Sequence, residues 1–294
     1  MTVVIEGQGR GRGIAKVRGD AVFENVLVGV DGHQGGRDAI ALAQQLAGFG
    51  ARITLAHVDP VQRTNGADRH LDSHEMLSSA RAAADIDPKL LVVHDPSVAH
   101  ALHELAAKRH HDLLVVGACH RGALGRRIAR DHTIESLKDA GCAVAIAPQG
   151  HVPTSGIARI GIGWDGSPEA AQALRAAKAI AARTGATIEP LVVIPRQSLP
   201  YGEPIQHRWS EVAKQLTPED AARFGGLDEL EGQVSYGSPG EALARFGEQI
   251  DLLIVGSRNS GPVGRLFTGS TSNYLARHPR CPLLVYPRSA GAQR

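Results

Sequence analysis

The segment from residue 256 to residue 271, with the sequence GSRNSGPVGRLFTGST, is the part of the chain whose residue types best fit a chemical task. It follows the apolar run Leu252–Val255 and leads into an expected helix that Ser270 or Thr271 would cap. Glycines let backbone amides approach an anion closely, and a helix N-terminus adds unpaired N–H groups at the positive end of its dipole. The segment therefore predicts a phosphate-binding loop, whose candidate contacts are Gly256, Ser257, Asn259, Gly261, Gly264, Gly269, Ser270 and Thr271.

This loop differs from the two most common phosphate-binding motifs. No Lys-Ser or Lys-Thr pair follows its second glycine, as a P-loop requires, and it does not come directly after the first strand, as a dinucleotide-binding GxGxxG does. The type of ligand must therefore be argued from the elements that position the loop.

The loop belongs to the second of two similar halves. Asp112–Gly117 (DLLVVG) recurs as Asp251–Gly256 (DLLIVG), and the segment 28–32 (VGVDG) recurs as 162–166 (IGWDG). Two tandem domains of one fold account for both matches. We expect a flexible tail at 1–22, a first domain at 23–149, a linker of loop composition at 149–156 and a second domain at 157–289.

Within each half, apolar runs alternate with helix-like stretches. Continuous β-branched runs are typical of strands covered on both faces, and the alternation predicts a doubly wound parallel sheet. The expected fold class is α/β, with two tandem Rossmann-like domains of five mainly parallel strands each and helices on both faces. The expected strands are 26–30, 53–58, 90–93, 113–116 and 143–147, then 160–164, 187–193, 233–236, 252–255 and 283–286, with an extra helix near 207–216.

In such sheets, ligands bind at the carboxyl ends of the strands where the strand order reverses. Asp31 and Asp165 follow the first strand of each half, and Gly117 and Gly256 end the fourth. An Asp-Gly pair after a strand is also an ordinary turn, so the pair by itself does not decide between a turn and a ligand contact.

Taken with this placement, the late loop resembles that of the universal stress proteins, whose ATP-binding members carry an Asp at the end of the first strand and a G-x2-G-x9-G-[ST] loop. Gly256, Asn259, Gly269 and Ser270 have that spacing, with Asn259 in place of the middle glycine. The resemblance implies that Asp165 and Val193 lie beside the adenine, and that Gly256, Gly269, Ser270 and Thr271 hold the ribose and phosphates. Gly163 and Trp164, which precede Asp165, are further candidate contacts of the nucleotide.

The first half matches this pattern less well. Asp31, Val58 and Gly117 are present as candidate contacts, but His120, Arg130 and Asp131 stand where the pattern has glycine, glycine and serine. A carboxylate about 4 Å from a phosphate is repelled by roughly 4 kcal/mol at an effective dielectric constant of about 20. Asp131 is therefore expected to weaken a nucleotide site, or simply to cap a helix.

The resemblance implies a stress-response protein that binds ATP or AMP, with Mg2+, as a sensor or regulator and not as a catalyst. It also implies an intramolecular pseudo-dimer formed through the last strand of each half, and it allows a homodimer. Two other functions stay open at this point: a slow ATP hydrolase or nucleotidyl transferase on the same scaffold, and a scaffold protein that binds no nucleotide.

Composition narrows the remaining possibilities. The net charge of +2 without a basic stripe argues against nucleic acid as a partner, and the absence of a long apolar run or export signal predicts no membrane span and a cytoplasmic location. The cysteines lack CxxC spacing, and Cys142 and Cys281 are expected to be small buried residues. His100 and His103 share a helix face but lack a third ligand, so no metal site is expected.

Overall fold

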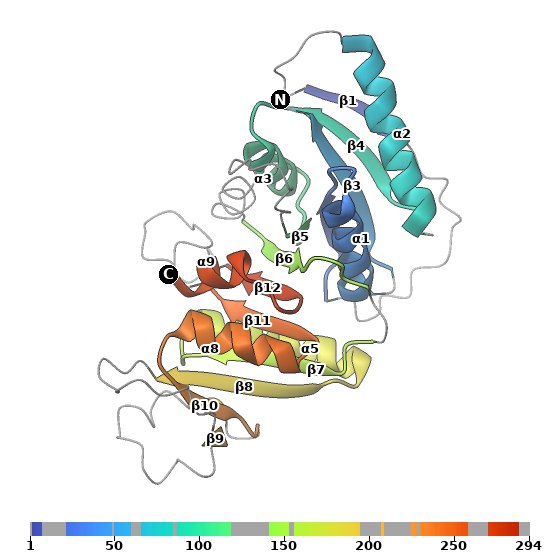
Figure 1. The fold of residues 1–294 in the computed structure, drawn as a ribbon. Helices are drawn as coiled ribbons and strands as arrows, with labels where there is room; N and C mark the ends of the chain where they lie inside the picture. The colour runs from blue at the N-terminus through green and yellow to red at the C-terminus, as the bar shows by residue number, and fades with distance from the viewer. Residues whose placement is uncertain are drawn as a thin grey trace, which may run out of the picture. The chain divides into compact units, whose positions relative to one another are not determined.

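The chain divides into two compact units, Met1–Thr154 (unit 1) and Ser155–Arg294 (unit 2). The computed structural model describes residues 2–7, 22–48, 50–59, 66–84, 87–118, 141–152, 156–194, 207–208, 225–227, 230–257 and 270–287. Each unit is built on a mainly parallel sheet with helices against it, which confirms the predicted fold class (Figure 1).

In the described part of unit 1, parallel strands lie side by side in the order β4-β3-β2-β5-β6. The strands are β2 (Asn25–Gly29), β3 (Arg52–Asp59), β4 (Lys89–His94), β5 (Leu113–Gly117) and β6 (Ala143–Ala147), and the helices are α1 (Gln34–Ala47), α2 (Gly66–Ala84) and α3 (Val98–Lys108). The strand order reverses between β2 and β5, as in doubly wound folds.

The described part of unit 2 repeats this arrangement with the parallel order β10-β8-β7-β11-β12. The strands are β7 (Arg159–Trp164), β8 (Thr187–Ile194), β10 (Gln233–Tyr236), β11 (Leu252–Gly256) and β12 (Leu283–Tyr286). The helices are α5 (Pro168–Thr184), α8 (Pro239–Phe246), the 3-10 turn η2 (Gly247–Gln249) and α9 (Ser270–Arg277). Here the order reverses between β7 and β11.

Helices cover both faces of each sheet. A Cβ added at Gly29 would lie 3.2 Å from Leu102 of α3, whereas one added at Gly117 would meet the backbone of α1. In unit 2, a Cβ at Gly163 would lie 3.1 Å from Leu243 of α8. Because both faces are covered, the middle residues of the strands are almost wholly buried, which explains their continuous apolar runs.

The aspartate that opens the repeated DLL motif has the same structural role in both units. Asp112 accepts hydrogen bonds from the backbone amides of Glu24 and Asn25, and Asp251 accepts them from Ala158 and Arg159 at 2.9 and 2.8 Å. These amides lie at the start of the neighbouring first strand. The motif therefore recurs because it fastens two central strands together at their amino ends.

One expectation about a chain segment was wrong, and another lies mostly outside the described residues. Thr2–Gly7 forms a strand, β1, antiparallel to β4, although 1–22 was expected to be a tail. Its β-branched run favours a strand, and the Gly/Arg composition that suggested a tail lies after it. At the start of the helix expected near 207–216, His207–Arg208 forms the short strand β9, antiparallel to β10, and residues 209–216 lie outside the described residues. Both strands complete the outer edge of a sheet, a pairing that helical periodicity cannot reveal.

The start of the expected linker is fastened to unit 1. The Asp38 carboxylate on α1 is 1% exposed and accepts hydrogen bonds from the Gly150 amide at 2.9 Å and the Gln34 side chain at 2.8 Å. His151 Nε2 lies 2.9 Å from Gln45 Oε1 on the same helix. Residues 150 and 151 are thus held by α1. Among the described residues, no helix is long and apolar enough to span a membrane.

Candidate functional site

The carboxyl ends of β7 and β11 form the edge of unit 2 where the strand order reverses. These strands are neighbours, with Val255 in register with Gly163. Asp165 directly follows β7, and Gly256 is the last residue of β11. The fold therefore brings these two predicted site residues to one edge, although they are far apart in the sequence.

Asp165 forms a tight turn into α5. Its Oδ1 accepts a hydrogen bond from the Ser167 amide at 3.0 Å, and Gly166 adopts a positive φ of 76° that favours glycine. Ser167 then caps the helix, because its Oγ accepts a hydrogen bond from the Ala170 amide at 3.1 Å. Asp165 itself is half-buried at the sheet edge.

Gly256 lies directly against the first turn of α5. A Cβ at this position would be 2.5 Å from the carbonyl carbon of Glu169 and 2.7 Å from the amide of Ala170. No side chain fits there, so the packing of the strand on the helix is enough to require this glycine. Glu169 itself is buried, and its carboxylate lies in the first turn, where the helix dipole favours negative charge.

The other described residues of unit 2 that were predicted to contact the ligand differ in how much of their side chains is exposed. Trp164 is only 5% exposed and lies beside Gly226, whose added Cβ would be 3.3 Å from its ring. Val193, one residue before the end of β8, is half-buried. Ser257 is buried, and its amide donates to the carbonyl of Tyr286 at 2.9 Å. Val193 is therefore the predicted contact on β8 that keeps exposed apolar surface.

The glycine-rich loop itself can be placed only by its ends. It leaves β11 at Gly256 and enters α9 at Ser270, and Thr271 is half-buried in the first turn of that helix. A Cβ at Gly240, in the first turn of α8 after the carboxyl end of β10, would lie 2.9 Å from Tyr274 of α9, so the N-terminal half of α9 lies toward the carboxyl edge of the sheet. Four of the predicted loop contacts lie outside the described residues, namely Asn259, Gly261, Gly264 and Gly269.

Unit 1 places Asp31 and Gly117 at the equivalent edge, after β2 and at the end of β5. Asp31 Oδ1 accepts hydrogen bonds from the amides of His33 at 2.9 Å and of Gly36 at 3.2 Å. A Cβ at Gly117 would lie 2.1 Å from the carbonyl oxygen of Gly35 on α1. Asp31 and Gly117 therefore have local structural roles in unit 1.

Met76 and Val58 characterise this edge of unit 1, whereas the segment of unit 2 that corresponds to α2 lies largely outside the described residues. Met76 on α2 lies over the turn that follows Asp31, since a Cβ at Gly32 would be 3.2 Å from Met76 Cγ. Val58, the counterpart of Val193, is 6% exposed. Met76 could not be identified from the sequence, because a helix does not reveal in its own sequence which strand end it covers. His120, Arg130 and Asp131 lie outside the described residues.

Among the described residues, Cys142, Cys281 and His100 were the side chains considered as nucleophiles or metal ligands, and each is buried or paired. Burial raises the pKa of the Cys142 and Cys281 thiols to about 12, so both are protonated at neutral pH, while Cys119 lies outside the described residues. His100 Nδ1 pairs with Asp95 Oδ2 at 3.1 Å. The described residues contain no group of three or more side chains placed to hold a metal ion.

The amide of Ser97 holds the pKa of the Asp95 carboxyl below its usual value, with a smaller contribution from His100. This carboxylate follows β4 and orders the turn into α3, whose N-cap is Ser97. Its environment is explained by that turn and does not indicate catalysis.

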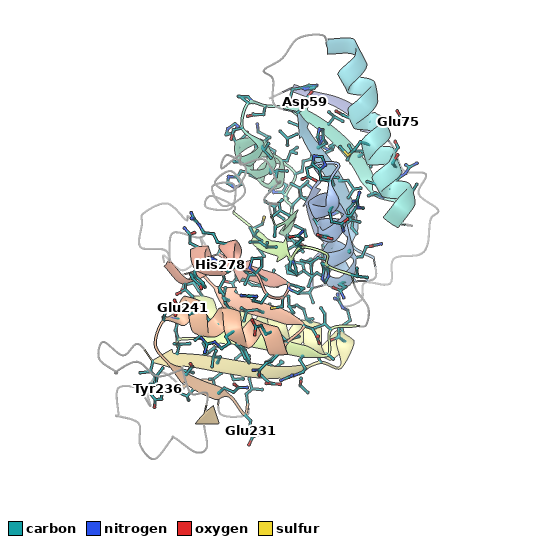
Figure 2. All side chains as sticks on the ribbon, viewed as in Figure 1. Asp59, Glu75, Glu231, Tyr236, Glu241 and His278 are labelled. Atoms are coloured by element: carbon teal, nitrogen blue, oxygen red, sulfur yellow. The ribbon has the colours of Figure 1, made fainter. Side chains whose placement is uncertain are left out.

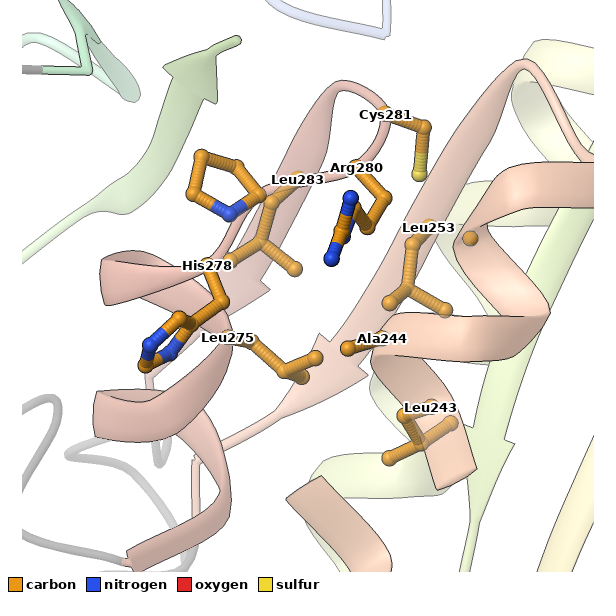
Figure 3. Close-up of a pocket in the computed structure, with 10 residues that line it drawn as sticks. Leu243, Ala244, Leu253, Leu275, His278, Arg280, Cys281 and Leu283 are labelled. Carbon is orange, nitrogen blue, oxygen red and sulfur yellow. The ribbon is translucent and has the colours of Figure 1, made fainter. Parts of the chain in front are cut away.

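A small apolar hollow lies elsewhere in unit 2 (Figure 3). It is formed between α8, α9 and the beginnings of β11 and β12, and it is lined by Leu243, Leu253, Leu275, Cys281 and Leu283 among others. Leu253 and Leu283 lie near the amino ends of their strands, so this hollow is at the opposite edge of the sheet from Asp165 and Gly256.

Comparison with known sequences identifies relatives of both halves. The sequence model of the universal stress protein family matches residues 23–148 and again residues 156–287. A universal stress protein of Thermus aquaticus, encoded beside a QAH/OAS sulfhydrylase, is 35% identical over 132 residues, which are 42% of this chain and 94% of that protein. A universal stress protein of Mycobacterium tuberculosis is 26% identical over 186 residues, and the match spans 60% of this chain and 62% of that protein.

One solved structure shares this architecture over most of the chain, and a second is similar to part of it. A universal stress protein from Archaeoglobus fulgidus, at 18% identity, aligns over 90% of this chain and 96% of its own with a TM-score of 0.62. A universal stress protein solved in complex with cAMP aligns over 44% of this chain and 98% of its own, with 26% identity and a TM-score of 0.35.

Proposed function

Because the chain belongs to the universal stress protein family, in a tandem arrangement, we propose that unit 2 binds an adenine nucleotide, ATP or AMP, as a sensor or regulator. The observation that carries this proposal is the convergence of Asp165, Gly256 and the N-terminus of α9 on one edge of the sheet, at the reversal of strand order. Ligands of open α/β sheets bind at this edge.

The described residues fit the parts of a nucleotide. The exposed part of Val193 offers apolar surface for a base, and the backbone amides in the first turn of α9, with the Thr271 hydroxyl, offer donors for phosphates. The glycines of the loop would let its amides approach the same phosphates. Gly256 supports the site through packing, since it lets α5 approach β11 closely.

The bound nucleotide would carry Mg2+ mainly through its own phosphates and water, as this ion prefers. We propose binding and not turnover as the activity of unit 2. Slow hydrolysis remains the alternative, and release of ADP or AMP that disappears in Asp165→Ala would support it.

We propose a structural or regulatory role for unit 1. Met76 over the Asp31 turn and the burial of Val58 support this assignment, because both reduce the surface available to a base. The cytoplasmic location, the pairing of the last strands of the two units and assembly into a homodimer stay predictions.

The test is to purify the full chain, denature it and measure released adenine nucleotide per chain, followed by calorimetric titration with MgATP. We expect about one site per chain, lost in Asp165→Ala and retained in the matched control Asp31→Ala. A stoichiometry of two would contradict the role given to unit 1. Neither bound nucleotide nor heat of binding would reject the proposal and favour a scaffold protein.

Two loop variants test the contacts expected from the sequence. Gly269→Asp is expected to abolish ATP binding in a folded chain, because it adds a side chain and a negative charge where phosphates would lie. Replacing Arg130 and Asp131 together by glycine and serine is expected to raise the nucleotide stoichiometry. Unchanged affinity in the first variant would reject the phosphate contact, and unchanged stoichiometry in the second would assign the defect of unit 1 to Met76 and Val58.

A further inference from the structure

Ser235, on β10, is a buried polar residue that the fold of unit 2 does not explain. It is 1% exposed, and in the part of the chain that the structure describes its Oγ has no hydrogen-bond partner. A buried hydroxyl without a partner destabilises a protein, because it loses its hydrogen bonds to water and gains none. Such a group is an exception that calls for an explanation, and a bound ligand or an ordered water is one that would satisfy the hydroxyl.

The position of Ser235 points to the proposed nucleotide site. Ser235 is in register with Val193 on the neighbouring parallel strand, and each is one residue before the carboxyl end of its strand. Residues in register on adjacent strands project to the same face of a sheet. Tyr236, the last residue of β10, marks this end of the strand in Figure 2. A base that packs on Val193 would therefore lie beside Ser235.

Unit 1 shows that this position does not need a hydroxyl for folding. Val93 on β4 is in register with Val58 on β3, as Ser235 is with Val193. Val93 is 0% exposed, and β4 pairs with β3 in the same parallel manner. Unit 1 thus has a valine at the position where unit 2 has a serine. The hydroxyl occurs in the unit that is proposed to bind a nucleotide.

We infer that Ser235 determines the base specificity of the site, by forming a hydrogen bond between its hydroxyl and a polar atom on the edge of the purine that packs on Val193. This inference rests on the proposed function of unit 2. The hydroxyl can donate to a ring nitrogen or accept from the exocyclic amine, so the recognised atom is found by removing each in turn from the ligand.

The experiment titrates the full chain and its Ser235→Ala variant with MgATP and with three analogues: purine riboside triphosphate, which lacks the exocyclic amine, and the 7-deaza and 1-deaza forms of ATP. Ser235→Ala is expected to weaken ATP binding roughly threefold to tenfold, the effect of one net hydrogen bond. At least one analogue should bind the wild-type chain more weakly than ATP does. The Ser235→Ala variant should bind that analogue and ATP with equal affinity, because it has already lost the hydrogen bond from the hydroxyl. Ser235→Thr, which keeps a hydroxyl, should restore the preference.

Thermal unfolding without nucleotide provides a readout that is independent of binding. Ser235→Ala should leave the Tm unchanged or raise it, since it removes a hydroxyl that has no partner. Thr54→Val is the matched control, because Thr54 Oγ1 is a buried strand hydroxyl that lies 3.5 Å from His111 Nε2. This control should lower the Tm and leave ATP binding unchanged.

The failures of the two proposals are distinguishable. A wild-type chain that binds no ATP would reject the proposed function and this inference together. A wild-type chain that binds ATP, with Ser235→Ala showing the same affinity and the same order of analogues, would reject only the inference. A Tm lowered by Ser235→Ala as much as by Thr54→Val would also reject it, since the hydroxyl would then stabilise the protein itself.

Discussion

The turn after the first strand uses the same Asp-Gly pair in both units but distributes its hydrogen bonds differently. In unit 1, Asp31 Oδ1 accepts from two amides, those of His33 and Gly36, and α1 has no side-chain cap from His33. In unit 2, Asp165 Oδ1 accepts from Ser167, and the Ser167 hydroxyl takes over the capping of α5. The recurrence of an aspartate at matching strand ends is therefore explained by the turn, and its role toward a ligand must be tested separately.

The strand-end glycines, unlike the aspartates, have the same contacts in both units. Each lets the first turn of a helix contact the strand backbone. Gly117 has this role in the unit whose loop departs from the nucleotide-binding pattern, so the glycine is part of the fold and not evidence for a ligand by itself.

The largest effect is expected from adding a methyl group at either glycine. Gly117→Ala and Gly256→Ala should each destabilise their own unit by about 3 kcal/mol or more, because the new Cβ would lie 2.1 and 2.5 Å from helix backbone atoms that cannot move aside. Hydrogen exchange measured on peptides of β5 and β11 separates the two units. A stable Gly256→Ala chain that fails only to bind nucleotide would show that the two glycines differ after all.

An intermediate effect is expected from removing the aspartates. Asp31→Ala should destabilise unit 1 by about 1–2 kcal/mol, the usual cost of losing a helix cap, while Asp165→Ala should destabilise unit 2 by about 1 kcal/mol or less, since Ser167 still caps α5. Urea unfolding followed by hydrogen exchange measures both. Equal losses of stability would contradict the difference drawn between the two turns.

A smaller, pH-dependent effect is expected at His111, which directly precedes the repeated DLL motif of unit 1. Its counterpart before the same motif in unit 2 is Ile250. Burial lowers the pKa of His111 below its ordinary value of 6.5, and the nearby Arg109 acts in the same direction. Below about pH 6.5 the unfolded chain therefore binds a proton that the folded chain resists, and unit 1 loses stability as the pH falls. His111→Ile should reduce this loss between pH 7.5 and pH 5.5, as measured by hydrogen exchange of β5.

The same measurement on β11, which belongs to the unit that carries Ile250, serves as the internal control and should not respond to His111→Ile. Burial also lowers the pKa of His151 in unit 1, so part of the acid sensitivity should persist in the variant. An unchanged pH dependence would show that His111 is not its source.

The smallest effect is expected at the amino edge of unit 2. Arg159 Nη2 and Glu189 Oε1 lie 2.9 Å apart, with 44% and 25% of their side chains exposed. In unit 1 the residue that corresponds to Arg159 is Asn25, whose Oδ1 accepts a hydrogen bond from Arg52 Nε at 2.7 Å. Glu189→Gln should cost less than about 1 kcal/mol, and the cost should shrink in high salt because the pair is screened. A salt-independent loss of stability would indicate that Glu189 acts through packing instead.

Much of the fold could be predicted because its signals are local. The parallel strands of both units carry continuous apolar runs, and helices such as α3 carry apolar residues at helical spacing, so the α/β class and the strand-end positions of Asp165 and Gly256 followed from the pattern. The edge strands β1 and β9 could not be predicted in this way. A strand of two residues, such as His207–Arg208, exists only through its partner.

The residues of the candidate site could likewise be predicted only in part. Residue types and spacing identified the loop and the aspartate as candidates, the resemblance to universal stress proteins added Val193, and the tandem repeat identified their counterparts in unit 1. The sequence did not identify Ser235 or Met76, because one depends on its register with a neighbouring strand and the other on which turn a helix covers.

The sequence by itself determined the two tandem domains, the alternation of strands and helices, and the residues at the strand ends, since these depend on propensity and periodicity along the chain. Only the tertiary structure decided which hydrogen bonds those residues make. It showed that Gly256 packs against Glu169, that Asp31 caps a helix and that the Ser235 hydroxyl has no partner among the described residues. The physical reason is that burial and hydrogen-bond satisfaction depend on elements brought together from distant parts of the chain, and no local pattern encodes that pairing.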